Sequence, residues 1–185
     1  MTSPLRRQAK HPASAMLAGP YAHPFHPILV TVPIGAWVAA LVFDIASHLV
    51  DDPAFLARGS LWLIAVGVIG ALLAAMIGFL DLLVIPAGTR AFRTGLLHMT
   101  LNLLVTAAYA GGFLWRHAGG GPSGSVPAGR LALSAVSLAV LAVSGYLGGK
   151  LAYRYGVRVA DEATQDEGFA TDSAGPRAEH RAHRP

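Results

Sequence analysis

Apolar residues run along this chain in four long stretches that are almost free of charge. The stretches cover about residues 26–49, 60–85, 95–115 and 131–153. Each is close to the roughly 20 residues that an α-helix needs to cross a bilayer. Residues 60–80 contain no charged side chain, whereas a helix of a soluble bundle carries polar residues on its outer face. Because the connections are short, the pattern predicts an all-α fold, an integral membrane antiparallel four-helix bundle.

Polar composition separates this predicted membrane domain from the two ends of the chain. Residues 23–159 contain the four spans, and residues 1–22 form an N-terminal arm. Residues 160–185 are polar and poor in aromatic side chains, which predicts a disordered tail. The first apolar run is longer than the 7–15-residue core of a signal peptide and has no convincing small-residue cleavage site. We therefore expect it to remain as the first span.

The overall composition supports a membrane protein and excludes several kinds of chemistry. Hydrophobic residues make up 54% of the chain and charged residues 13%, against about 25% charged in soluble domains. Cysteine is absent, so this chain cannot build a disulfide, a thiolate metal site, a thiol nucleophile or an iron–sulfur cluster. The net charge of +4 comes from basic residues beside the apolar runs. We interpret them as a topology signal and expect no nucleic-acid partner.

Basic residues are concentrated on one side of the four spans. That side has Arg6, Arg7, Lys10, Arg90, Arg93, Lys150, Arg154 and Arg158, and the other side has Arg58, Arg116 and Arg130. Loops rich in Lys and Arg stay in the cytoplasm. The distribution therefore predicts that both termini are cytoplasmic.

Polar residues inside the first span share one helix face. His26, Pro33, Trp37, Asp44 and His48 follow one another at steps of seven, four, seven and four residues. Pro33 has no N–H and can kink the helix. Asp44 and His48 lie one turn apart at the outer end and form a predicted outer-side pair. A hydrogen bond at the helix end explains this pair as well as a role in proton movement does.

A second polar set is expected at the inner end, from the second and third spans. His98, Asn102 and Tyr109 share a face of the third span, and Asp81 lies near the end of the second. Asp81 and His98 are expected at a similar depth, roughly 5 Å inside the boundary by helix rise. A carboxylate–imidazole pair would satisfy both groups and fix the imidazole tautomer. The sequence therefore predicts that Asp81 contacts His98.

The segment HPFHP, residues 23–27, brings further histidines to this inner end. Each histidine is followed by a proline, which stiffens the approach to the first span. The expected polar cluster consists of His26, Asp81, His98 and Asn102, with His23 and Tyr153 at its rim. Neutral imidazoles from different helices are suitable ligands for a b-type haem or another metal. His26 and His98 are therefore the candidate ligands.

Four segments of the sequence resemble the bacterial domain-of-unknown-function family 2231 of predicted membrane proteins. They are HPILVTVPIGAWVAALVFD at 26–44, AAMIGFLD at 74–81, HMTLN at 98–102 and LGGKLAYRYGVRV at 147–159. The resemblance covers about residues 21–159 and implies a four-helix protein of the bacterial cytoplasmic (inner) membrane. It implies no established activity. Some members are joined to Rieske iron–sulfur domains, which this cysteine-free chain does not contain.

Three functions are compatible with these observations. The first is a non-catalytic membrane subunit whose polar residues orient the helices. The second is a redox protein that binds b-type haem or a metal ion through His26 and His98, and the third is proton or small-solute transport. We expect no enzyme, because the sequence has no nucleophile elbow, phosphate loop or zinc-helix motif. The expected partners are the lipid bilayer and either a redox partner or a second copy of the chain.

Overall fold

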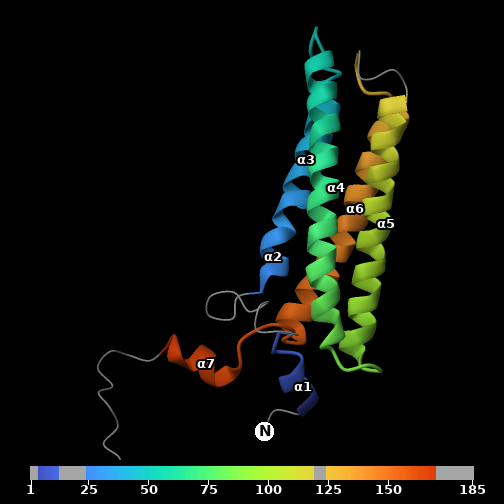
Figure 1. The fold of residues 1–185 in the computed structure, drawn as a ribbon. Helices are drawn as coiled ribbons and strands as arrows, with labels where there is room; N and C mark the ends of the chain where they lie inside the picture. Colours follow the sequence, from blue (N-terminus) through green and yellow to red (C-terminus); the bar gives the residue numbers. More distant parts are fainter. Residues whose placement is uncertain (1–3, 13–23, 119–123, 170–185) are drawn as a thin grey trace, which may run out of the picture.

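The computed structural model describes residues 4–12, 24–118 and 124–169 (Figure 1). Four helical segments in these residues are long and apolar enough to cross a membrane: Phe25–Ala46, Ala54–Leu83, Arg90–Ala118 and Ala128–Arg154. The described residues contain no β-strand. The predicted all-α class with four membrane-spanning helices is therefore confirmed.

The first span is divided into two helices, α2 (Phe25–Leu29) and α3 (Thr31–Ala46). Pro33 lacks the N–H that would bind the carbonyl of Leu29, and α2 ends at Leu29. The neighbouring bonds from Val30 N to His26 O (3.1 Å) and from Ile34 N to Val30 O (3.3 Å) are retained. The interruption predicted from Pro33 is therefore local, and the chain continues in helical form on both sides of it.

The remaining spans are longer than their apolar stretches. Helices α4 (Ala54–Leu83) and α5 (Arg90–Ala118) begin about one turn or more before the predicted starts at residues 60 and 95. Helix α6 (Ala128–Gly149) continues directly into a π-helix, η3 (Lys150–Arg154). Charged residues can continue a helix beyond its apolar part. Hydropathy therefore predicts only the apolar part of each helix and leaves out its polar ends.

Neighbouring helices pair in opposite directions. Along α2–α3 and α4, the bonded pairs are His26 with Ala74, Trp37 with Ile64, and Asp44 with Ser60. Along α5 and α6 they are His98 with Ser144 and Tyr109 with Ser134. In both sets the residue number rises in one helix as it falls in the other. Figure 1 shows the same alternation in the colours of α3, α4, α5 and α6.

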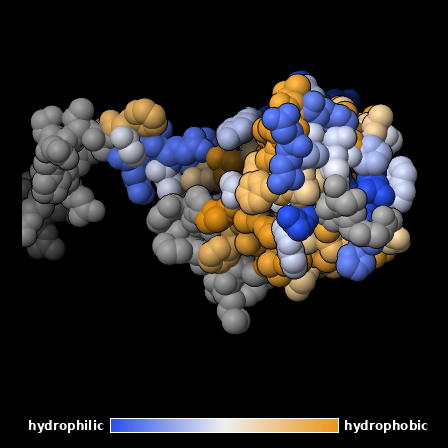
Figure 2. Space-filling view, turned by 90° about the horizontal axis from the view of Figure 1, so that it is seen from above, coloured by the Kyte–Doolittle hydropathy of each residue, from blue (hydrophilic) through white to orange (hydrophobic). Residues whose placement is uncertain are grey.

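The bundle has a small internal core and a largely apolar exterior. Trp37, Ala40, Ile64, Val105 and Tyr109 form the buried cluster at its centre. Many large apolar side chains face outward, as expected for helices in contact with lipid tails. Seen from above in Figure 2, hydrophilic side chains gather on the end of the bundle among hydrophobic ones that continue around its sides.

Two short helices lie together at the end of the bundle where α2 begins. They are α1 (Pro4–Gln8) and α7 (Glu162–Glu167) (Figure 1). Arg6 and Glu162 form an ion pair of 2.9 Å between them. Ala9 is buried against Leu82, Ile85 and Val157, and its carbonyl accepts a bond of 3.0 Å from Arg158 N. The described parts of both termini therefore lie at the same end of the bundle.

Candidate functional site

A cavity of about 400 Å³ opens between the helices at the end of the bundle that contains His26. Its walls are mainly apolar and come from all four spans. The polar side chains among its lining residues are His26, Asp81, His98, Asn102, Thr106, Tyr153 and Arg158. A mostly apolar cavity with a few converging polar groups is the usual form of a ligand site.

The ring of His26 is held by the backbone of α4. Its Nδ1 lies 2.9 Å from the carbonyl oxygen of Ala74. A carbonyl can only accept a hydrogen bond, so Nδ1 carries the proton and donates it. In the neutral imidazole the other nitrogen, Nε2, is then the one without a proton and can bind a metal.

His98 is held in the same way by the backbone of α6. Its Nδ1 lies 2.8 Å from the carbonyl oxygen of Ser144, so it donates to that carbonyl. The Nδ2 of Asn102 lies 3.2 Å from Nε2 of His98 and also donates to His98 O and Ser144 Oγ. Asn102 therefore covers Nε2 of His98, and a ligand at that nitrogen would replace this contact.

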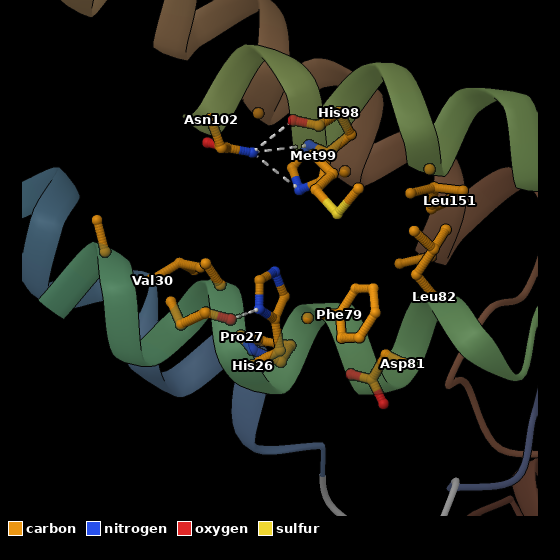
Figure 3. Close-up of a pocket in the computed structure, with 18 of the residues that line it drawn as sticks. His26, Pro27, Val30, Phe79, Asp81, Leu82, His98, Met99, Asn102 and Leu151 are labelled. Atoms are coloured by element: carbon orange, nitrogen blue, oxygen red, sulfur yellow. Dashed lines mark hydrogen bonds between the residues drawn. The ribbon is translucent and has the colours of Figure 1, made fainter. Parts of the chain in front are cut away.

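The two imidazoles face one another across the cavity (Figure 3). Their ring centres are 6.2 Å apart and their planes are nearly perpendicular, at 81°. Each ring packs on a glycine one turn after the residue that accepts its bond. A Cβ at Gly78 would lie 2.8 Å from the His26 ring, and a Cβ at Gly148 would lie 3.0 Å from the His98 ring. The two histidines thus occupy matching cradles on α4 and α6.

The structure gives Asp81 a different partner from the one predicted. Its Oδ1 lies 3.0 Å from Nε of Arg158, and both side chains are largely buried. His98 instead binds Ser144 and Asn102. The prediction of an Asp81–His98 pair is wrong because it considered depth alone. It overlooked Arg158, which returns to the bundle after η3 with a left-handed backbone (φ 58°).

The two residues predicted at the rim differ in outcome. Tyr153 is among the lining residues, and its side chain is 93% exposed, so it lies at the outer edge of the cavity. His23 lies outside the described residues. The chemistry of the cavity therefore rests on His26, His98 and Asn102.

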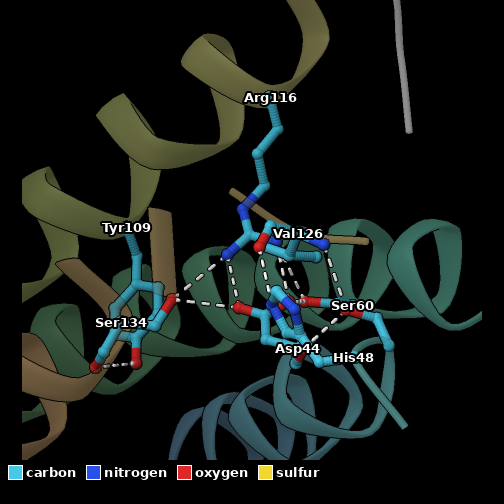
Figure 4. Close-up of polar contacts among 8 residues, drawn as sticks. Asp44, His48, Ser60, Tyr109, Arg116, Val126 and Ser134 are labelled. Atoms are coloured by element: carbon cyan, nitrogen blue, oxygen red, sulfur yellow. Dashed lines mark hydrogen bonds and ion pairs between the residues drawn. The ribbon is translucent and has the colours of Figure 1, made fainter. Parts of the chain in front are cut away.

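A buried ion pair lies at the opposite end of the bundle (Figure 4). Arg116 of α5 makes two bonds to Asp44 of α3, of 2.8 Å and 2.6 Å, one to each carboxylate oxygen. Ser60 Oγ donates to the same carboxylate from α4, and Ser134 Oγ lies 3.4 Å from it on α6. Asp44 is fully buried and Arg116 is 4% exposed. All four spans therefore contribute to one satisfied polar network.

The predicted outer-side pair of Asp44 and His48 is not formed. His48 Nε2 lies 2.9 Å from the carbonyl oxygen of Val126. Ser47 accepts a bond from Val126 N and donates to Asp44 O. The two contacts with Val126 join the end of α3 to the segment before α6. The correction has a simple reason: Asp44 faces the bundle centre, where a guanidinium is available, and His48 lies at the edge.

Sequence reasoning missed Arg116 because it was assigned to the flanking charges. One signal was present: Arg116 follows Tyr109 by seven residues and so continues the face of His98, Asn102 and Tyr109. Ser60 and Ser134, which complete the network, were not among the predicted site residues. Arg158 offered no comparable signal, because its return depends on the left-handed turn at residues 156–158.

The cavity supplies two imidazoles, while the carboxylate among its lining residues, Asp81, is paired with Arg158. The described residues contain no group of three or more His, Cys, Asp or Glu side chains that could hold a metal ion. A bare zinc ion usually has three or four protein ligands. Two imidazoles instead fit a metal whose remaining positions are occupied by a macrocycle, as in haem. His26 and His98 are the side chains that would hold such a group.

Comparison with known proteins identifies the family. The model of a family described as predicted membrane proteins (DUF2231) matches residues 22–161, which include all four spans. The chain matches no curated protein and no solved structure. Since the match covers most of the sequence and agrees with the four apolar helices, this chain belongs to the DUF2231 family of predicted membrane proteins.

Proposed function

We propose that this protein is a non-catalytic membrane subunit that holds a b-type haem between His26 and His98. The observation that carries the proposal is the pair of imidazoles, 6.2 Å apart, in a mostly apolar cavity. Each ring is held by a bond from Nδ1 to a backbone carbonyl, which leaves Nε2 as the ligand atom of the neutral imidazole. At His98 a ligand would replace the contact of Nε2 with Asn102. When bound, haem would supply one-electron chemistry, and the chain would supply the ligands and the low-polarity surroundings.

Haem is favoured over a bare metal ion for two reasons. Only two suitable side chains meet here among the described residues, fewer than a bare zinc ion needs. The lining is largely apolar, with glycine, alanine, leucine and phenylalanine from several helices. Such walls suit a large hydrophobic ring and offer few oxygen ligands to a hydrated cation.

Transport is supported less well, because the charged groups are already paired. Asp44 is neutralised by Arg116, and Asp81 is paired with Arg158. A transport path needs polar groups that can change partners, and each of these carboxylates is already held by a guanidinium. The described polar groups therefore favour a fixed bundle with one ligand cavity.

We also propose that the protein lies in the cytoplasmic membrane of a bacterium with the His26 cavity toward the cytoplasm. The basic residues on that side of the spans support this orientation. The excess of Lys and Arg on this side remains when the two buried arginines, Arg116 and Arg158, are not counted. A redox protein that docks on the cytoplasmic side is the partner that this position would suit.

Haemin titration of the purified protein in detergent tests the proposal. The full chain should bind one haemin and give the absorption bands of a low-spin, bis-imidazole haem. His26→Ala and His98→Ala should each lower the affinity at least tenfold and abolish the low-spin bands. His48→Ala is the matched control and should bind like the wild type. Equal haemin binding by all four proteins would overturn the proposal.

A further inference from the structure

We infer that the bundle consists of two equivalent helical hairpins related by a pseudo-twofold axis, and that Asp44 and Arg116 select the pairing of unlike hairpins. The first hairpin contains α2, α3 and α4, and the second contains α5, α6 and η3. The surface that each presents to the other is an interface for which a second copy of this chain could compete. The inference is independent of whether haem binds.

Three pairs of side chains join the first helix of one hairpin to the first helix of the other. In each pair the two residues are the same number of positions apart in the sequence. The pairs are His26 with His98, Trp37 with Tyr109, and Asp44 with Arg116. Each pair differs by 72 residues (98 − 26, 109 − 37 and 116 − 44). Trp37 and Tyr109 stack with ring centres 4.2 Å apart. A residue meets its own equivalent only on a twofold axis, so three such contacts define the axis.

The contacts of these residues with the second helix of their own hairpin are also equivalent. His26 and His98 donate to the carbonyls of Ala74 and Ser144. Trp37 and Tyr109 donate to the carbonyls of Ile64 and Ser134. The glycines beneath the imidazoles are Gly78 and Gly148. All three pairs differ by 70 residues, so the two hairpins share one internal register.

Burial follows the same correspondence. In the first helix Pro33, Trp37, Ala40 and Asp44 are buried, and in α5 their equivalents Val105, Tyr109, Gly112 and Arg116 are buried. In the second helix Ile64, Gly67 and Ala74 match the buried Ser134, Ser137 and Ser144. The match ends near the charged pair, since Ser60 corresponds to Arg130, which instead donates to Trp115 O.

The charged position is where the two hairpins differ most in chemistry. If two first hairpins paired across the axis, two Asp44 carboxylates would be buried face to face. If two second hairpins paired, two Arg116 guanidinium groups would meet. Buried like charges are strongly unfavourable, whereas the observed pair is bidentate and carries serine contacts from α4 and α6. The ion pair therefore favours unlike hairpins and opposes pairing between like hairpins of two chains.

Cysteine crosslinking of the full chain in the membrane tests this selection. The chain has no cysteine, so Ala40→Cys introduces a single thiol in the buried central cluster of the bundle. Direct disulfide formation needs Cα atoms within about 7 Å, so a short membrane-permeable bismaleimide is used to join two such thiols when like hairpins of two copies face each other. The background is either wild type or Asp44→Leu/Arg116→Met, which removes both charges. Val38→Cys, on the exposed side of α3, measures random collisions in each background.

The inference predicts almost no crosslinked dimer of the Ala40→Cys variant in the wild-type background. In the uncharged background the amount of this dimer should rise at least fivefold, with the Val38→Cys dimer unchanged. An equally low amount of the Ala40→Cys dimer in both backgrounds would overturn the selection role.

The exchange of charges gives a second test. Asp44→Arg and Arg116→Asp should each lower the melting temperature by about 10 °C, and the double variant should recover at least half of that loss. A double variant no more stable than either single one would overturn the equivalence of the two positions.

Discussion

The polar pairs at the two ends of the bundle are satisfied in different ways. At one end, Asp44 and Arg116 close directly on each other with two hydrogen bonds. At the other end, His26 and His98 do not bond to each other, and each binds a backbone carbonyl of its own hairpin. The first arrangement satisfies both side chains within the pair. The second leaves Nε2 of His26 without a hydrogen bond among the described residues and gives Nε2 of His98 only the contact with Asn102.

This difference separates a structural polar cluster from a candidate binding site. Buried charges need a close partner, and the Asp44–Arg116 network supplies it from all four spans. Neutral imidazoles need less, and one backbone bond satisfies one nitrogen of each ring. The second nitrogen can take a ligand at His26 directly, and at His98 in exchange for the contact with Asn102. Polar residues in a membrane span therefore indicate function most strongly where their own contacts leave a group unused.

The largest effect is expected from breaking the ion pair on one side. Arg116→Met leaves Asp44 buried without its partner and should lower the free energy of unfolding by about 3–5 kcal/mol. Asp44→Leu/Arg116→Met should recover most of this loss, because an apolar pair has no charge to desolvate. Thermal unfolding in one detergent measures both. A single variant within about 1 kcal/mol of the wild type would contradict a structural role for this pair.

The next effect concerns the glycine cradles of the two histidines. Gly78→Ala and Gly148→Ala place a Cβ 2.8 Å and 3.0 Å from the imidazole rings, so the rings must move. Overpacking of this kind costs about 1–3 kcal/mol, and we expect haemin affinity to fall about tenfold. Gly111→Ala, where a Cβ meets nothing within 4 Å, is the control. If all three variants bind haemin alike, the cradles do not position the rings.

A smaller effect is expected at the second buried carboxylate. Asp81→Asn removes the ion pair with Arg158 and should cost about 1.5–3 kcal/mol of stability, the range for a hydrogen bond to a charged group. Haemin affinity should change less than twofold, since His98 has other partners. A double-mutant cycle of Asp81→Asn with Arg158→Gln should show coupling. Coupling of Asp81 with His98 instead would restore the pairing expected from sequence.

The smallest effect is expected at the contact between α1 and α7. A hydrogen bond from its own backbone N–H, together with the charges of Lys10 and Arg6, lowers the pKa of Glu162. A lowered pKa stabilises the folded contact above the ordinary pKa of about 4.5, and the contribution is lost as the pH falls through the lowered value. The protection factors of the amides in residues 4–9, taken relative to the intrinsic exchange rate at each pH, should therefore fall below about pH 4. Glu162→Gln should show the lower protection at every pH. A flat profile in the wild type would show that this ion pair does not hold α1.

Hydropathy was sufficient for the fold because the bilayer imposes a length and a polarity on every span. The four helices, the interruption near Pro33 and the grouping of His26 with His98 all follow from the sequence pattern. These features depend on helical periodicity and on which end of a span a residue occupies. Both are local properties that a sequence displays.

The partners of the two aspartates could not be obtained in this way. Asp81 and His98 have a similar depth, yet depth does not fix the rotation of one helix against another, and Arg158 takes the place of His98. Asp44 and Arg116 lie in different hairpins, and helix rotation again decides whether they meet. The constant 72-residue offset is visible only once contacts show which residues face each other.

The most direct test of the haem site is the visible absorption spectrum, oxidised and reduced, of the protein purified from its own membranes. The account predicts a low-spin Soret band with sharp α and β bands on reduction, at one haem per chain. The same bands should be absent from His26→Ala and His98→Ala proteins that remain folded. A wild-type protein without a Soret band, even after haem is supplied during expression, would contradict the account.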